Sequence, residues 1–126
     1  MAKLTSDVAQ HTALYVEAFN RGDADAVNAM YTEEAVAVWE PGVPLTGQDR
    51  IDAVKEFLAR GPKMTAVPRQ SFVTGDTALL IVDWSIDTKD ADGKPERLEG
   101  VGVDVLRLNA DGHWLYAIDD PYGEEK

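Results

Sequence analysis

The 126-residue sequence contains no cysteine, only two histidines and few basic residues. Without cysteine the chain has no disulfide, no thiolate nucleophile and no thiolate zinc ligand, which fits a reducing cytoplasm. His11 and His113 are too few to build a three-ligand zinc site, so no metal is expected. Twelve Lys and Arg residues stand against 23 Asp and Glu, and the resulting charge of −11 repels phosphate backbones and anionic lipids. We therefore expect no nucleic-acid partner and no membrane-surface role.

Long apolar runs and the common cofactor motifs are also missing. No window approaches the length of a membrane span, and Asp7, Gln10 and His11 interrupt the opening stretch where a secretory signal would be apolar. We therefore expect neither export nor anchoring, and predict a cytoplasmic protein. No phosphate loop, dinucleotide fingerprint or serine-nucleophile elbow occurs, which predicts that no cofactor is bound. Acidic residues downstream of Thr88 have calcium-loop offsets, but Thr88 takes the place of the first ligand, so an ordinary β-turn is expected there.

The apolar share of 44% is that of a globular protein, and we expect one domain over residues 1–126. Apolar residues recur at helical spacing after a cap at Thr5 or Ser6. This pattern predicts a helix that runs to about Arg21 and is closed by Gly22 in a left-handed conformation.

Two further helices and a short strand are predicted in the first half of the chain. Asp23 is placed to cap a short second helix with Met30 and Tyr31 on its inner side. Residues 35–40 form a β-rich run that ends before a Pro-Gly pair. The segment Thr46-Gly47-Gln48-Asp49 then resembles a capping box that opens a third helix.

The second half of the chain changes to a period of two, which is typical of β-strands. Four strands are predicted, over residues 64–74, 77–88, 96–108 and 114–119. Their joints, Gly75-Asp76, Asp92-Gly93 and Asp111-Gly112, have hairpin chemistry, so the strands should be antiparallel neighbours. The order helix, helix, strand, helix and then a meander predicts an α+β fold.

Both faces of the central strands are apolar. Leu79 and Ile81 lie opposite the face that carries Leu80 and Val82, whereas a sheet with one solvated face should alternate apolar with polar residues. If helices cover one face, a second copy of the chain can cover the other. We therefore predict a homodimer that pairs through the outer face of the sheet.

Four polar residues are candidates for a functional site. Tyr15 falls within the apolar stripe of the first helix, where its hydroxyl either donates to a ligand or bonds to the protein core. Glu40 ends the first strand before Pro41, either as a proton-transfer group in a cavity or as a solvated acid. Asp104 interrupts an apolar strand, and is either functional or paired with an arginine such as Arg69 or Arg107. Asp119 and Asp120 stand at the end of the last strand, where one should face the interior and the other water; Asp119 is either a group at the mouth of a pocket or an exposed terminal acid.

The residues and the order of elements resemble the nuclear transport factor 2-like superfamily, which includes SnoaL-like cyclases and ketosteroid isomerases. The segment from Tyr15 to Asp23, followed by Met30-Tyr31-Thr32-Glu33-Glu34-Ala35, is similar to its opening helices and first strand. The run from Asp104 to Asn109, followed by Asp111-Gly112-His113-Trp114, is similar to its closing strands. The last strand looks closer to a bacterial branch of the superfamily with no settled reaction than to true isomerases.

This resemblance implies a cone-shaped fold in which a curved antiparallel sheet packs against three helices and encloses a pocket. In ketosteroid isomerases a tyrosine and a protonated aspartic acid hold the substrate oxyanion while a carboxylate moves the proton. Tyr15, Asp104 and Glu40 match these positions, although the last is Glu rather than Asp. The expected pocket-lining residues are Phe19, Met30, Trp39, Trp84 and Asp119.

Two functions stay open at this point. One is a small-molecule pocket protein that performs acid–base isomerisation or proton transfer on an apolar, carbonyl-bearing ligand. The other is a non-catalytic ligand-binding or dimeric assembly module. A sizeable cavity around the three acid–base candidates favours the first, whereas a filled interior and an arginine partner for Asp104 favour the second.

Overall fold

The computed structural model of the chain describes residues 4–123. Within them the three helices and two strands of the first half are followed by four consecutive strands, an α+β fold. The helices are α1 (Val8–Asn20), α2 (Ala24–Ala29) and α3 (Gly47–Leu58). The strands are β1 (Tyr31–Glu40), β2 (Val43–Leu45), β3 (Lys63–Thr74), β4 (Thr77–Lys89), β5 (Pro95–Leu108) and β6 (Trp114–Asp120). The predicted fold class and the four predicted strands of the second half are confirmed.

The strands form one sheet in the order β2-β1-β6-β5-β4-β3. The hairpins β3–β4, β4–β5 and β5–β6 are antiparallel, as their turn residues predict. Gly75, Gly93 and Gly112 have φ of 56°, 79° and 79°, a left-handed backbone that glycine adopts without strain. Strand β1 joins the other side of β6 in parallel, a long-range pairing that the turn chemistry did not predict.

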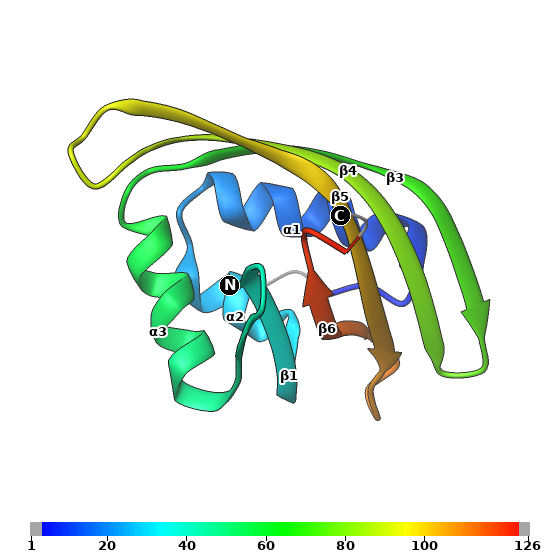
Figure 1. The fold of residues 1–126 in the computed structure, drawn as a ribbon. Helices are drawn as coiled ribbons and strands as arrows, with labels where there is room; N and C mark the ends of the chain where they lie inside the picture. The colour runs from blue at the N-terminus through cyan, green and yellow to red at the C-terminus, as the bar shows by residue number, and fades with distance from the viewer. Residues whose placement is uncertain (1–3, 124–126) are drawn as a thin grey trace.

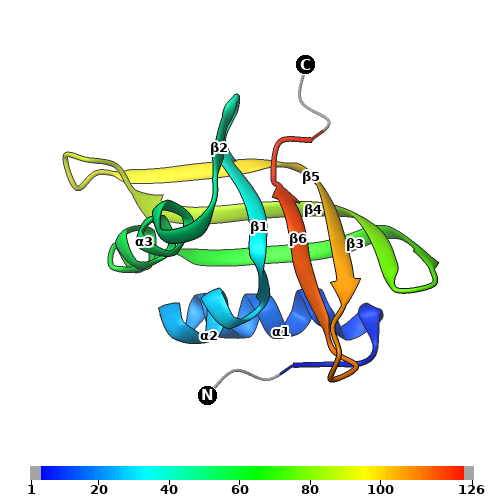
Figure 2. The same ribbon diagram turned by 90° about the horizontal axis from the view of Figure 1, so that it is seen from below.

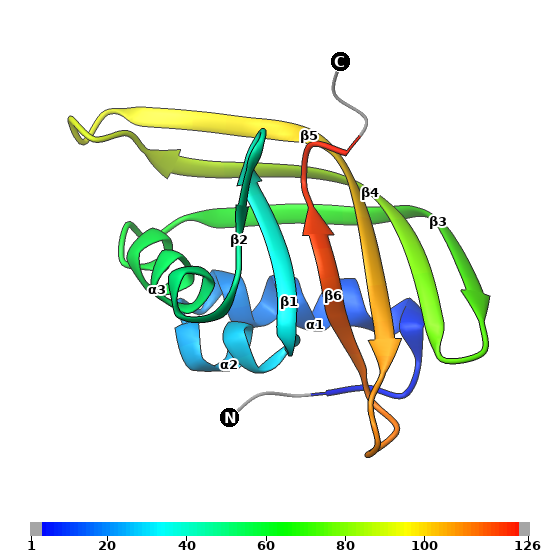
Figure 3. The same cartoon turned by 60° about the horizontal axis from the view of Figure 1, so that its bottom comes forward.

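The sheet bends strongly, and the helices lie inside the bend (Figure 1). Helix α1 runs beneath the long strands β3, β4 and β5, and α3 stands beside β2 at the end of the sheet (Figures 2 and 3). Register shifts between Pro68 and Gln70 in β3 and between Val105 and Leu106 in β5 interrupt the ladders. Such bulges increase local twist and bend a strand, which helps the sheet to curve around the helices.

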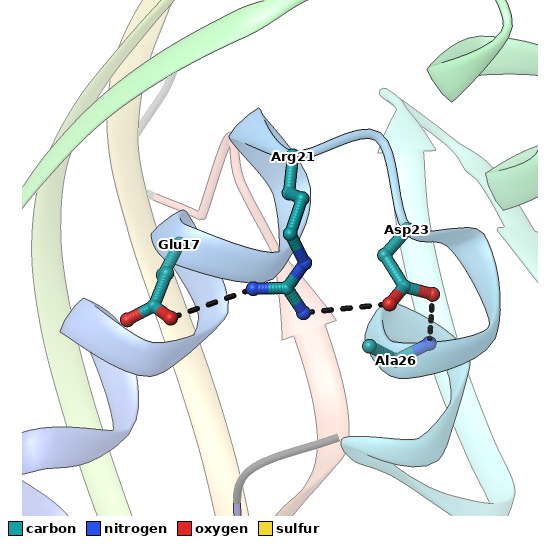
Figure 4. A network of polar contacts seen from close by, with 4 residues as sticks. All are labelled: Glu17, Arg21, Asp23 and Ala26. Atoms are coloured by element: carbon teal, nitrogen blue, oxygen red, sulfur yellow. Dashed lines mark hydrogen bonds and ion pairs between the residues drawn. The ribbon is translucent and has the colours of Figure 1, made fainter. Parts of the chain in front are cut away.

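A network of polar contacts fixes the corner between α1 and α2 (Figure 4). Arg21 lies 3.4 Å from carboxylate oxygens of both Glu17 and Asp23, and Asp23 Oδ1 accepts a 3.0 Å hydrogen bond from the backbone N–H of Ala26. The last contact is the predicted N-cap of α2, which typically contributes about 1 kcal/mol. The predicted left-handed Gly22 is also confirmed, with φ of 74°.

Three local predictions were wrong in detail. The N-cap of α1 is Asp7, whose side chain accepts from Ala9 N–H, rather than Thr5 or Ser6. Thr46 stands at the N-cap of α3 without a side-chain hydrogen bond, so no capping box forms. Helix α2 ends before Tyr31, which is the first residue of β1 and not part of a helix.

The hydrophobic core lies between the inner face of the sheet and the helices. Its most deeply buried side chains include Phe19, Val27, Val54, Leu80 and Leu106. Asn20 ties α1 to β3, because its side chain donates to Met64 O at 2.9 Å and accepts from Met64 N–H at 2.6 Å. No helix in the described part of the chain is long and apolar enough to cross a membrane.

Candidate functional site

A cavity of about 320 Å³ lies inside the bend of the sheet. Most of its wall is apolar and comes from α1, α3, β3, β4 and β5: Phe19, Phe57, Met64, Val82, Ile86 and Leu98. Tyr15, Asp104 and Asp119 are the buried polar residues of the lining on which its chemistry depends. A mostly apolar pocket with a few polar groups is the usual form of a small-molecule site.

The structure brings together most of the residues that the sequence singled out. Tyr15, Glu40 and Asp104 all line this cavity, as do the expected ligand-binding residues Phe19, Trp39, Trp84 and Asp119. Met30 is the exception. It forms the C-cap of α2, is 1% exposed within the core, and does not belong to the described lining, so its prediction as a lining residue is corrected.

Asp104 and Asp119 form a buried carboxyl pair. They lie directly opposite each other across β5 and β6, and are 5% and 7% exposed. Their side chains are hydrogen-bonded to each other, and Asp104 Oδ1 also accepts from the backbone N–H of Asp120 at 3.2 Å. Burial, with repulsion from Asp119, raises the pKa of Asp104 well above its usual value. Asp104 therefore holds a proton that it donates to Asp119.

Asp119 accepts several hydrogen bonds from other side chains of the site. Its Oδ2 accepts from the Tyr31 hydroxyl at 2.5 Å and from Trp39 Nε1 at 3.0 Å. The Tyr31 hydroxyl is in turn 2.9 Å from the hydroxyl of Tyr15. Burial raises the pKa of Asp119 too, but hydrogen bonds from Tyr31, Trp39 and Asp104 oppose this shift and favour its ionised form. Asp119 is therefore the buried anion of the pair.

Tyr31 and Arg50 are parts of the site that sequence reasoning missed. Arg50 is 4% exposed, and its guanidinium carbon lies 4.5 Å from the centre of the Tyr31 ring. Its Nη1 donates to Asn28 Oδ1 at 3.3 Å. This cation stands near Asp119 behind the cavity wall and offsets part of the buried negative charge. No local pattern marked either residue, because both act through contacts distant in sequence.

Glu40 lies at the mouth of the cavity, where β1 turns into β2. The strand register shifts between Ala37 and Glu40, and Gly42 turns the chain with φ of 79°. Glu40 is exposed at this break in the ladder and belongs to the lining of the cavity. The position suits a group that exchanges protons with water.

Neither arginine considered as a partner for Asp104 is its observed partner. Arg107 is exposed beside Val105 and Ile118 on the outer face of the sheet. Arg69 pairs with Asp83, to which it donates through Nε and Nη2, and both side chains are about half exposed. Asp83 lies on the opposite face of β4 from Leu80, which is the cross-strand neighbour of Asp104. The observed partner of Asp104 is another carboxyl, an arrangement that sequence reasoning did not consider.

The segment after β6 folds over one end of the cavity. Trp84 Nε1 donates to Pro121 O at 2.6 Å, and the Tyr122 ring packs edge-on against Trp84. Gly100 allows this close approach, because a Cβ there would lie 3.2 Å from the Trp84 ring and 3.3 Å from Pro121 O. Gly100 therefore serves packing.

The buried acidic groups of the cavity are engaged with one another and with neighbouring donors. Within residues 4–123, no group of three or more His, Cys, Asp or Glu side chains is placed to hold a metal ion. The two buried carboxyls bond to each other and to Tyr31 and Trp39. What the arrangement can do is hold a proton and fix the hydroxyl of Tyr15.

Comparisons with known proteins agree with this fold. A family model described as a SnoaL-like domain matches residues 12–117. A ketosteroid isomerase-like protein from Erwinia carotovora atroseptica has 25% identity and a TM-score of 0.71, over 86% of this chain and 87% of that one. An NTF2-like protein with a cystatin-like fold from Novosphingobium aromaticivorans has 18% identity and a TM-score of 0.68, over 89% and 76%.

A third solved structure is provisionally named a calcium/calmodulin dependent protein kinase II association domain, from Xanthomonas campestris. It has 20% identity and a TM-score of 0.72, over 94% of this chain and 90% of that one. No curated protein matches the chain in sequence. These similarities confirm the NTF2-like, cystatin-like fold that the sequence resemblance implied.

Proposed function

The chain belongs to the SnoaL-like domain family, and on that premise we propose that its cavity binds a small, mostly apolar molecule carrying one hydroxyl or carbonyl group. The observation that carries this proposal is the cavity itself, about 320 Å³ of space with apolar walls and buried polar groups. A core built only for stability would fill such a space, because an unfilled cavity costs free energy.

A native mass spectrum of freshly purified protein tests for a retained ligand and reports the number of subunits. A cavity-filling variant sharpens the test. Ala53→Phe places a ring in the lining from α3, and Ala13→Phe places the same ring on the exposed side of α1. Binding of tetralin derivatives, bicyclic molecules that are small for this cavity, should be lost in the first variant and kept in the second. Equal binding in both variants contradicts the proposed site.

Acid–base catalysis is a second candidate function, favoured because Tyr15, Glu40 and Asp104 line one cavity. In this reading Glu40 removes a proton from a carbon beside a ketone, while Tyr15 and Asp104 turn their protons from Tyr31 and Asp119 toward the ketone oxygen. The probe is deuterium exchange at the α-carbon of 2-tetralone. Glu40→Gln should lower the rate above buffer by about 100-fold or more. Glu34→Gln, an exposed change on the same strand, should have no effect, and an unchanged rate in Glu40→Gln excludes the mechanism.

We also propose that two copies pair through the outer face of the sheet. Leu79, Ile81, Val103 and Val105 are half-buried there, and Ile118 beside them is 43% exposed. Such a contiguous apolar face on an exposed sheet is typical of an interface between proteins. Location in the cytoplasm, expected from the lack of cysteine, stays a prediction.

A further inference from the structure

The hydrogen bonds behind the cavity have a direction, and their end point is Asp119. Trp39 Nε1 can only donate, so its 3.0 Å contact marks Asp119 Oδ2 as an acceptor. The same oxygen is 2.5 Å from the Tyr31 hydroxyl, a length typical of a hydroxyl that donates to a carboxylate. The proton of Tyr31 is therefore directed at Asp119.

This assignment decides the direction of the next bond. A tyrosine hydroxyl has one hydrogen, and that of Tyr31 is already given to Asp119. In the 2.9 Å contact between Tyr15 and Tyr31, the donor must then be Tyr15. Tyr15 lines the cavity. Because its proton is directed at Tyr31, its hydroxyl oxygen can offer a ligand lone pairs but no proton.

Two neighbouring donors are committed in the same way, whereas the hydroxyl of Thr12, which also lines the cavity, has no hydrogen-bond partner among the described residues. Asp104 gives its proton to Asp119, and Trp84 Nε1 gives its proton to Pro121 O. The described residues that line the cavity include three carboxyls and no lysine, arginine or histidine. An anionic ligand is therefore disfavoured, and the polar end of the cavity is rich in acceptors.

We infer that the ligand donates a hydrogen bond to Tyr15, and that the cavity selects apolar alcohols and phenols over ketones. Tyr116 also lines the cavity, with its ring centre 5.0 Å from that of Tyr15, and its hydroxyl can donate to the same ligand oxygen. A hydroxyl group satisfies both tyrosines, because it donates and accepts at once. A carbonyl oxygen can accept from Tyr116 but meets only lone pairs at Tyr15, so it makes one hydrogen bond fewer than a hydroxyl.

This inference rests on the proposed ligand-binding cavity and chooses between its two polar groups. A ketone would match the alcohol only if Tyr15 turned its proton toward the ligand. Tyr31 would then keep an unpaired lone pair in the core, at the cost of a buried hydrogen bond. Because the Tyr15 proton is directed at Tyr31, Tyr15 is also poorly placed to donate a hydrogen bond to an oxyanion.

The test compares three molecules with one skeleton, 2-tetralol, 2-tetralone and tetralin, by ligand-observed NMR at pH 7. The alcohol should bind about 3- to 10-fold more tightly than the ketone, the effect of one hydrogen bond. The ketone, which can still accept from Tyr116, should bind between the alcohol and tetralin. If none of the three binds, the proposed function fails. If all bind and the ketone equals or exceeds the alcohol, only the present inference fails.

Tyr31→Phe is the decisive variant, because it removes the acceptor of the Tyr15 proton without changing the lining. Tyr15 can then donate to a ligand, so the ketone should gain affinity and the preference should disappear or reverse. Tyr15→Phe should also remove the preference, but without a gain for the ketone. It serves as the second test if Tyr31→Phe does not fold. An alcohol preference that survives in either folded variant overturns the inference.

Discussion

Replacing Asp104 by asparagine should stabilise the protein, and the gain should grow as pH rises. The side chain of asparagine has the same shape, so its amide can donate to Asp119 and its oxygen can still accept from Asp120 N–H. The change removes the titratable carboxyl group at position 104. In the folded protein burial keeps Asp104 protonated, whereas in the unfolded chain it ionises near its ordinary pKa of 3.8.

The magnitude follows from the linkage between protonation and folding. Because the pKa of Asp104 is raised in the folded state, its contribution to stability is fully present below about pH 4 and is lost as pH rises. Each pH unit between the unfolded and folded pKa values costs wild type about 1.4 kcal/mol. The asparagine variant does not pay this cost at position 104. The difference in free energy of unfolding should therefore increase by about 1.4 kcal/mol per pH unit above about pH 4.

Urea unfolding from pH 4 to pH 8 measures this difference directly. Asp111→Asn, in the exposed turn between β5 and β6, is the control and should change stability equally at every pH. A constant difference between Asp104→Asn and wild type would show that Asp104 is ionised in the fold. A difference that grows toward low pH would refute the assignment of the proton to this pair.

Three further predictions concern other parts of the molecule. Burial lowers the pKa of His11 to about 4, so its contribution to stability is present above about pH 6.5 and is lost as pH falls. His11→Phe should abolish this loss, which amounts to about 3 kcal/mol of the free energy of unfolding by pH 4 in urea titrations. An unchanged loss in the variant would show that His11 is charged in the fold. Asn20→Ala should lower the free energy of unfolding by about 1–3 kcal/mol, because two hydrogen bonds to Met64 are lost, and an unchanged unfolding midpoint would contradict this. Ile118→Asp should convert a dimer to a monomer in light scattering, whereas Glu96→Lys at an exposed strand end should not, and a monomeric wild type would refute the interface.

Local chemistry predicted much of the fold. The three hairpins follow from turn residues whose glycines adopt left-handed backbone, and the α1–α2 corner follows from Gly22 and Asp23. These signals depend on neighbouring residues only. Tyr31 was misplaced because a helical spacing from Asp23 continued to it, while its actual position is set by pairing with Tyr116 on β6. A parallel pairing of distant strands leaves no mark in a local window.

The sequence predicted which residues belong to the candidate site better than it predicted their contacts. Tyr15 and Asp104 were singled out because each places a polar group in an apolar pattern, and both line the cavity. The partner of Asp104 was sought among arginines, because opposite charges are the common solution. The observed solution, a proton shared with Asp119, depends on the register of β5 against β6. That register includes a bulge, which a strict period of two does not reveal.

The destabilising features of this domain gather in one place. The carboxyl pair weakens the fold as pH rises, and the unfilled cavity lacks the packing that the rest of the core has. The helix corner and the hairpins have no comparable cost, and they are the parts that local rules predict. Departures from such rules are expected where a protein trades stability for function. The grouping of these costs around Tyr15, Tyr31 and Asp119 therefore supports a cavity used for ligand recognition over a merely structural interior.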